Sequence, residues 1–166
     1  TSDNGGDHFV ANNGGLRRSK TWLYEGGIRV PMIARYPVLG QSGVENETPV
    51  NFIDFYPTLM EMTGGSTDQH LDGTSLLPLL KGETINREEL YWYYPAGISS
   101  WNDRKACVIR KGDYKLIYYP KIDKTLLFNL RTDPEEMHDL AEDPVHESII
   151  EDLRQTLKQL QNETGD

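Results

Sequence analysis

The sequence predicts a mixed fold, α/β to α+β, in which the end of a larger α/β domain precedes a small antiparallel sheet packed with a C-terminal helix. Three observations predict this order. A long loop, a strand-like run and two helical patterns fill the first half of the chain. Four aromatic and aliphatic runs separated by turn residues follow. The chain then ends in an amphipathic helical pattern.

The first half begins with a loop. Residues 1–20 are rich in Gly and Asn, and so long an irregular stretch is usually functional or disordered. Residues 28–36 then alternate between apolar and other side chains, which predicts a strand. Pro31 lacks a backbone N–H, so we expect this strand at a sheet edge or with a bulge.

Two helices are predicted next. Residues 54–63 have helical apolar spacing, Asp54 can cap their first turn, and Gly64–Gly65 follows their end. Ser75 is expected to cap a short apolar helix over residues 76–81. The first half therefore resembles the last strand, loop and helix of an α/β sheet that starts upstream.

The periodicity changes from helical to strand-like after Arg87. Four runs have strand composition: Leu90 to Tyr94, Ala106 to Arg110, Tyr114 to Tyr119 and Leu126 to Leu130. Lys111-Gly112-Asp113 predicts a tight hairpin between the second and third. Residues 148–161 predict a helix with one apolar side, so we expect it to cover one face of the sheet. These patterns place a domain boundary between residues 1–85 and 86–166.

Composition and charge exclude several classes of protein. The 166 residues contain no run of about eighteen apolar residues, so we expect no membrane span or membrane partner. Cys107 is the only cysteine, which excludes a disulfide framework. A net charge of −9 argues against nucleic acid as the partner. Residues 1–40 differ, because their net charge of +2 could steer an anionic ligand.

Two short segments offer candidate chemistry. Asp3-Asn4-Gly5-Gly6 places carboxylate and amide oxygens beside two glycines, which suits a hard cation such as Ca²⁺ or Mg²⁺. The alternative is a plain turn, and two side-chain oxygens cannot complete the roughly six to eight that Ca²⁺ takes. Lys20 could neutralise an anionic oxygen or a leaving group, or it could be an exposed loop lysine. The four histidines show no metal-ligand spacing.

Six segments, in order, resemble the carboxy-terminal part of a sulfatase of the arylsulfatase type, within the alkaline phosphatase superfamily. They are TSDNGG (residues 1–6), KTWLYEGGIRVP (20–31), DFYPTLMEMTG (54–64), LDGTSLLPLLKG (71–82), RKGDYKLIY (110–118) and LFNLRTDPEEMHDL (127–140). The pattern K-x-x-x-Y-E-G-G-x-R-x-P downstream of S-D-N-G-G is the most specific of them. The resemblance implies that residues 1–85 end the α/β catalytic domain and that residues 86–166 form the small C-terminal subdomain.

The resemblance also implies site roles. Asp3 and Asn4 are expected to ligate a divalent cation, usually Ca²⁺ and sometimes Mg²⁺, and Lys20 to contact the sulfate and stabilise charge as the ester bond breaks. The family nucleophile is a formylglycine made from Cys or Ser in a C/S-x-P-x-R motif, and this sequence has no such motif. We therefore expect the nucleophile and further cation ligands upstream of Thr1, and no appreciable sulfatase activity from this chain alone.

The expected substrate is a sulfate ester, with a sulfated glycan as a plausible form. The parent is expected to be exported, to the periplasm, the cell exterior or the lysosome. Exposed apolar faces on residues 28–36 and 54–62 predict either self-association or disorder of residues 1–20.

Two alternatives stay open. A phosphodiesterase or phosphonate hydrolase of the same superfamily shares the metal-binding Asp but commonly uses another nucleophile. A non-catalytic module could instead bind a glycan or a partner through aromatic residues, which are Tyr91, Trp92, Tyr93, Tyr94 and Trp101. The simpler interpretation is that those aromatic residues pack in the core of a small sheet.

Overall fold

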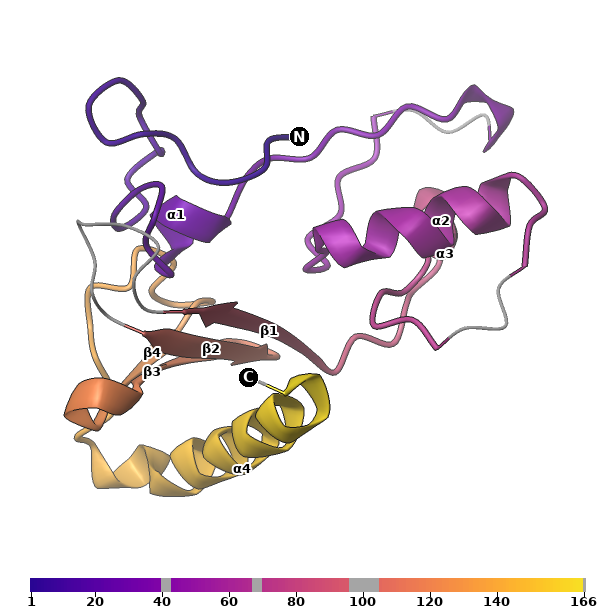
Figure 1. The fold of residues 1–166 in the computed structure, drawn as a ribbon. Coiled ribbons are helices and arrows are strands. Elements are labelled where there is room, and N and C mark those ends of the chain that lie inside the picture. Colours follow the sequence, from indigo (N-terminus) through magenta and orange to yellow (C-terminus); the bar gives the residue numbers. More distant parts are fainter. Residues whose placement is uncertain (40–42, 67–69, 96–104, 166) are drawn as a thin grey trace. The chain divides into compact units, whose positions relative to one another are not determined.

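The computed structural model describes residues 1–39, 43–66, 70–95 and 105–165 (Figure 1). These residues form two compact units. The sheet unit joins Thr1–Met32 to Glu89–Asp166, and the helical unit is Ile33–Glu88. The N-terminal loop thus packs with the C-terminal sheet, far away in sequence. The assignment of residues 1–85 to a catalytic domain stays a prediction.

The sheet unit contains one four-stranded antiparallel sheet in the order β1-β2-β3-β4, which confirms the four predicted strands. Their bounds are Glu89–Tyr94, Ala106–Lys111, Tyr114–Tyr119 and Lys124–Asn129. In the β2–β3 hairpin Lys111 pairs with Tyr114 across the turn. Gly112 has a φ of 59°, a left-handed conformation that glycine adopts without steric cost. The predicted hairpin at this glycine is therefore confirmed.

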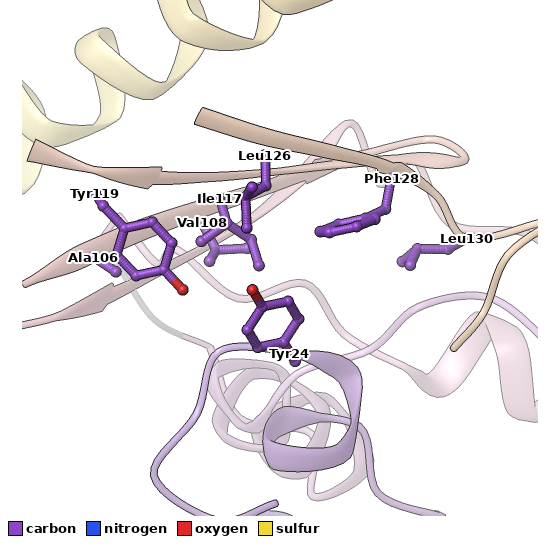
Figure 2. Packing of buried hydrophobic residues seen from close by; sticks show 8 residues of the cluster. All are labelled: Tyr24, Ala106, Val108, Ile117, Tyr119, Leu126, Phe128 and Leu130. Atoms are coloured by element: carbon purple, nitrogen blue, oxygen red, sulfur yellow. The ribbon is translucent and has the colours of Figure 1, made fainter. Parts of the chain in front are cut away.

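The alternation of side chains along the strands gives the sheet two buried faces. Cys107, Ile109, Leu116 and Leu127 pack with Leu153 and Leu157 of helix α4 on one face. The opposite face carries the cluster of Figure 2, where Val108, Ile117 and Phe128 of the sheet meet Tyr24 of the N-terminal segment. The expectation that the C-terminal helix covers one face of the sheet is confirmed, and the N-terminal segment, which was not expected there, covers the second face.

Helix α4, Glu147–Thr164, confirms the predicted C-terminal helix. Leu153 and Leu157 are its buried residues, one turn apart, as an amphipathic helix requires. Gly165 follows the helix at a φ of 75° and donates its N–H to Gln161 O. Figure 1 shows α4 on one side of the sheet and α1, Glu25–Ile28, on the other.

The strand predicted over residues 28–36 is wrong. Ile28 ends α1, and the following residues form no strand. Pro31 has no N–H to donate to a neighbouring strand, and Ile33 is 90% exposed. The alternating apolar side chains therefore do not pack against a core here. The pattern alone could not reveal whether a partner strand exists.

The helical unit contains α2, Phe55–Met62, and α3, Leu77–Leu80, as predicted. Ser75 Oγ accepts from Leu77 N at 3.2 Å, but Leu76 is the N-cap residue of α3 and no side chain caps this helix, so the predicted Ser75 cap is wrong. Asp54 differs from the expectation, because its side chain does not cap α2. It is fully buried instead, pairs with Arg87, and accepts hydrogen bonds from Thr74 N at 2.9 Å and Asn51 N at 2.7 Å.

Candidate functional site

Asp3 and Asn4 lie side by side near the start of the sheet unit. Asn4 Nδ2 donates to Asp3 Oδ2 at 2.7 Å, and Ser2 Oγ donates to Asp3 Oδ1 at 3.3 Å. Asp3 is exposed and Asn4 is half-buried. A carboxylate and an amide carbonyl are thus available to solvent at one point of the loop.

Backbone hydrogen bonds tie this loop to the segment that carries Lys20. Lys20 N donates to Gly6 O at 3.1 Å, and Gly5 N donates to Gly27 O at 2.9 Å. Gly26 N donates to Arg17 O at 2.9 Å and closes the second segment on itself. The structure therefore brings together the two motifs that the sequence analysis singled out.

The close approach of these backbones requires glycine. A Cβ atom on Gly5 would collide with Gly26 O, and a Cβ on Gly26 would collide with the carbonyl oxygens of Arg17 and Arg18. Gly26 and Gly27 are buried in α1. Gly5 therefore allows the two loops to touch, and Gly26 allows residues 17–26 to fold back on themselves.

The Lys20 side chain is exposed, so its ammonium group is accessible to an anion. Two residues near Lys20 adopt the left-handed backbone conformation: Arg18 has a φ of 66° and Thr21 a φ of 77°. A positive φ is costly for a β-branched residue such as Thr21, and such strain of order 1–3 kcal/mol persists only where surrounding contacts fix the chain. The contacts around Lys20 thus determine its backbone position.

The donor set fits a hard cation only in part. Asp3 and Asn4 supply oxygen ligands, the kind that Ca²⁺ and Mg²⁺ prefer. Among the described residues, no group of three or more His, Cys, Asp or Glu side chains could hold a metal ion. Asp3 and Asn4 would therefore supply only part of the coordination of such a cation.

A buried cluster of charges lies on the same face of the sheet as the N-terminal segment, and sequence reasoning missed it. Lys115 Nζ lies 2.8 Å from Glu25 Oε1 and 2.8 Å from Glu136 Oε1. Burial raises the pKa of the Glu136 carboxyl, and the Lys115 ammonium opposes that shift. One signal was present in the sequence. Lys115, Ile117 and Tyr119 are spaced two residues apart in β3, so they share one face of the strand, and Ile117 and Tyr119 are buried there.

Arg17 adds a second link to Glu136. Its guanidinium donates to Glu136 O at 2.6 Å and stacks over the Tyr24 ring at 4.4 Å from the centroid. Glu25, Lys115 and Glu136 come from three of the segments that resemble sulfatases. The cluster therefore joins three segments that are far apart in the sequence.

The aromatic residues of β1 mostly serve packing. Tyr91 and Tyr93 pack on the α4 side of the sheet, and Trp92 packs on the opposite side. Trp101, the residue named for the glycan-binding alternative, lies outside the described residues. These β1 side chains thus pack against the two clusters and stay partly exposed, and the glycan-binding alternative stays a prediction.

Residues 17–163 match the family described as N-sulphoglucosamine sulphohydrolase, C-terminal, and the chain belongs to this family. It is 37% identical over 161 residues to a sulfatase of Formosa agariphila, covering 89% of this chain and 29% of the relative. It is 28% identical over 171 residues to an N-acetylglucosamine-6-O-sulfatase of Bacteroides thetaiotaomicron, covering 100% of this chain and 30% of the relative.

Among solved structures, the fold is similar to a protein in complex with its substrate D-glucosamine-2-N,6-O-disulfate. The TM-score is 0.58 at 26% identity, over 66% of this chain and 23% of that protein. The expected sulfatase resemblance is therefore confirmed. The chain spans 29–30% of the length of the two curated relatives. Across the described residues, no helix is both long and apolar enough to cross a membrane.

Proposed function

We infer that this chain is the carboxy-terminal portion of a sulfuric ester hydrolase, with Asp3 and Asn4 as cation ligands and Lys20 as a sulfate-binding and catalytic residue. One observation carries the inference. The Lys20 N–Gly6 O and Gly5 N–Gly27 O hydrogen bonds join the segment with the cation-type oxygens to the segment with the lysine. A sulfate ester needs both kinds of group at one point, because negative charge develops on its oxygens as the ester bond breaks.

Each residue has a defined task in this proposal. Asp3 and Asn4 would hold the divalent cation, Ca²⁺ or Mg²⁺, which when bound supplies positive charge next to the sulfate oxygens. The exposed Lys20 ammonium would bind a sulfate oxygen and stabilise the charge on the leaving oxygen. The chain offers no formylglycine motif, so we expect the nucleophile from residues upstream of Thr1.

The proposed substrate class is a sulfated glycan, with a sulfated amino sugar as its first candidate. Three findings support this class: the family description, the similarity to an N-acetylglucosamine-6-O-sulfatase, and the similarity to the protein solved with D-glucosamine-2-N,6-O-disulfate. An export pathway for the parent protein remains part of the proposal.

The experiment uses the complete reading frame that contains this chain. We expect it to hydrolyse an aryl sulfate, and Lys20→Met to lower kcat by about 10²–10³, the usual cost of removing one preorganised charge-stabilising donor. Lys158→Met is the matched control, because Lys158 is exposed on α4 away from the loop, and its kcat should be unchanged.

Two results would contradict the proposal. One is an unchanged kcat in the Lys20→Met enzyme. The other is a preference for a phosphonate monoester over the aryl sulfate, which would favour the phosphonate hydrolase alternative.

A further inference from the structure

A buried lysine connects the sheet to the segment that carries the candidate site. Lys115 belongs to β3, and its side chain is inaccessible to solvent. It contacts Glu25 Oε1 and Glu136 Oε1, each at 2.8 Å. A buried ammonium group is tolerated only when it is paired. The two carboxylates therefore explain why a lysine stands at a core position of this strand.

Glu136 holds both ends of the Lys20 segment. Arg17 donates to Glu136 O at 2.6 Å, and Glu25 N donates to Glu136 Oε2 at 2.6 Å. Residues 17–25 thus form a loop whose two ends meet at one residue, and Lys20 lies between them. Glu136 itself has a φ of 56°, so local contacts fix its backbone in an unusual conformation.

The same connection reaches Asp3 and Asn4. Glu25, Gly26 and Gly27 belong to the single short helix α1. Gly27 O accepts from Gly5 N at 2.9 Å, next to Asn4 in the chain. A displacement of Glu25 would therefore move both the Lys20 loop and the loop with the cation-type oxygens.

We propose that Lys115 and Glu136 are positioning residues, which fix the Asp3, Asn4 and Lys20 loops on the sheet through the Lys115–Glu25 and Glu136–Glu25 contacts. The inference rests on the proposed function, because it concerns the same site. Without Lys115, two carboxylates would share a buried space and repel one another. Glu25 would then leave the sheet, and the loops that depend on it would lose their fixed backbone.

Hydrogen exchange measured on the complete protein that contains this chain tests this. In Lys115→Met we expect the amides of Gly5, Lys20 and Gly26 to exchange at least tenfold faster, while the amides of Leu153 and Leu157 in α4 keep their rates. Lys111→Met is the matched control in the neighbouring strand. Lys111 pairs with Asp152 at 2.9 Å on the surface, so its loss should leave Gly5, Lys20 and Gly26 unchanged.

The pattern of exchange separates a positioning role from a merely structural one. Unchanged exchange of Gly5, Lys20 and Gly26, or a uniform acceleration that includes α4, would overturn the inference. If Lys115→Met does not fold, the shape-preserving Glu25→Gln decides by the same criterion. Failure of both variants to fold would also overturn it, because the cluster would then support the whole unit.

The measurement contains no sulfate ester. Absence of sulfatase activity in the complete protein would overturn the proposed function and leave this result unchanged. Loss of the exchange pattern would overturn the positioning role and leave the activity unchanged.

Discussion

At the scale of single residues, close contacts between backbones define the candidate site. The carbonyl oxygens of Arg17 and Arg18 occupy the space that a side chain on Gly26 would need. The same holds at Gly5, which faces Gly26 O. Backbone atoms cannot rotate away as a side chain can. A side chain on Gly5 would therefore push the two loops apart, and one on Gly26 would distort residues 17–26 themselves.

Gly26→Ala tests this contact. We expect it to lower the free energy of unfolding by about 1–3 kcal/mol, as for other overpacked sites. Urea unfolding followed by tryptophan fluorescence measures the loss. Gly65→Ala is the control, because its nearest atom is the flexible end of the Met60 side chain and the cost should be much smaller. Equal losses in both variants would contradict the close-contact argument.

A second residue-scale prediction concerns Asp133, at the start of the turn before Glu136. Its burial raises the carboxyl pKa, but hydrogen bonds from Met137 N at 3.0 Å and His138 N at 2.8 Å more than offset this, so the pKa lies below its usual value. A lowered folded pKa stabilises the folded state above the unfolded pKa of about 3.9. That stabilisation is lost as the pH falls through the folded pKa.

The difference in unfolding free energy between wild type and Asp133→Asn should therefore be constant near pH 7 and shrink as the pH falls below about 4. Urea unfolding at a series of pH values measures it. Asp113→Asn, at a turn position whose side chain is 51% exposed, is the control and should show a smaller change. A difference that grows toward low pH would contradict the predicted direction.

At the scale of elements, the helical unit is organised around one buried ion pair. Asp54 is fully buried, and it joins the residues before α2 to Thr74 and Arg87. Thr58 extends the connection, because its hydroxyl donates to Asp54 O and accepts from Leu76 N at 2.8 Å. These contacts relate α2 to α3 through two segments that resemble sulfatase blocks.

Arg87→Met removes the partner of a buried carboxylate and should destabilise the helical unit by about 3–5 kcal/mol. Hydrogen exchange of the α2 amides, such as Leu59 and Met60, measures the loss. Arg35→Met is the control, since Arg35 is exposed in the same unit and its removal should leave α2 exchange unchanged. If the α2 amides of Arg87→Met exchanged at the wild-type rate, the claim that the Asp54–Arg87 ion pair stabilises the helical unit would be contradicted.

At the scale of the whole molecule, the proposed chemistry needs groups beyond those of this chain. The chain spans 29–30% of the length of two curated relatives, and in the proposal Asp3 and Asn4 would supply two of the oxygen ligands that a hard cation needs. Exposed apolar side chains remain on both units, among them Val10 in the sheet unit and Ile33 and Leu59 in the helical unit. Self-association of the isolated chain, or disorder of residues 1–20, therefore stays a prediction, and sedimentation velocity measures the former.

We expect the purified 166-residue chain to show no turnover of an aryl sulfate above the rate of a blank, with or without added Ca²⁺. A covalent nucleophile is missing from its sequence, and one lysine with two cation ligands cannot replace it. The complete reading frame, assayed in parallel, is the positive control. Turnover by the isolated chain that follows the protein through purification would contradict the prediction.

Local pattern predicted most of the elements. The four strands, the Gly112 hairpin and α4 were found because period and turn residues are properties of neighbouring residues. The strand over residues 28–36 failed because a strand also needs a partner, which local alternation cannot reveal. Asp54 failed as a helix cap for a related reason, because Arg87 and Thr74 bind it from far along the chain.

The sequence by itself determined the family, the candidate residues Asp3, Asn4 and Lys20, and the alternation that gives the sheet two faces. Only the tertiary structure decided that the N-terminal segment covers one of those faces and that Lys115 pairs with Glu25 and Glu136, 90 residues from the first of them. The physical reason is the cost of burying charge. A buried lysine in a strand is stable only if acidic side chains pair with it, and side chains distant in the sequence meet only in the folded chain.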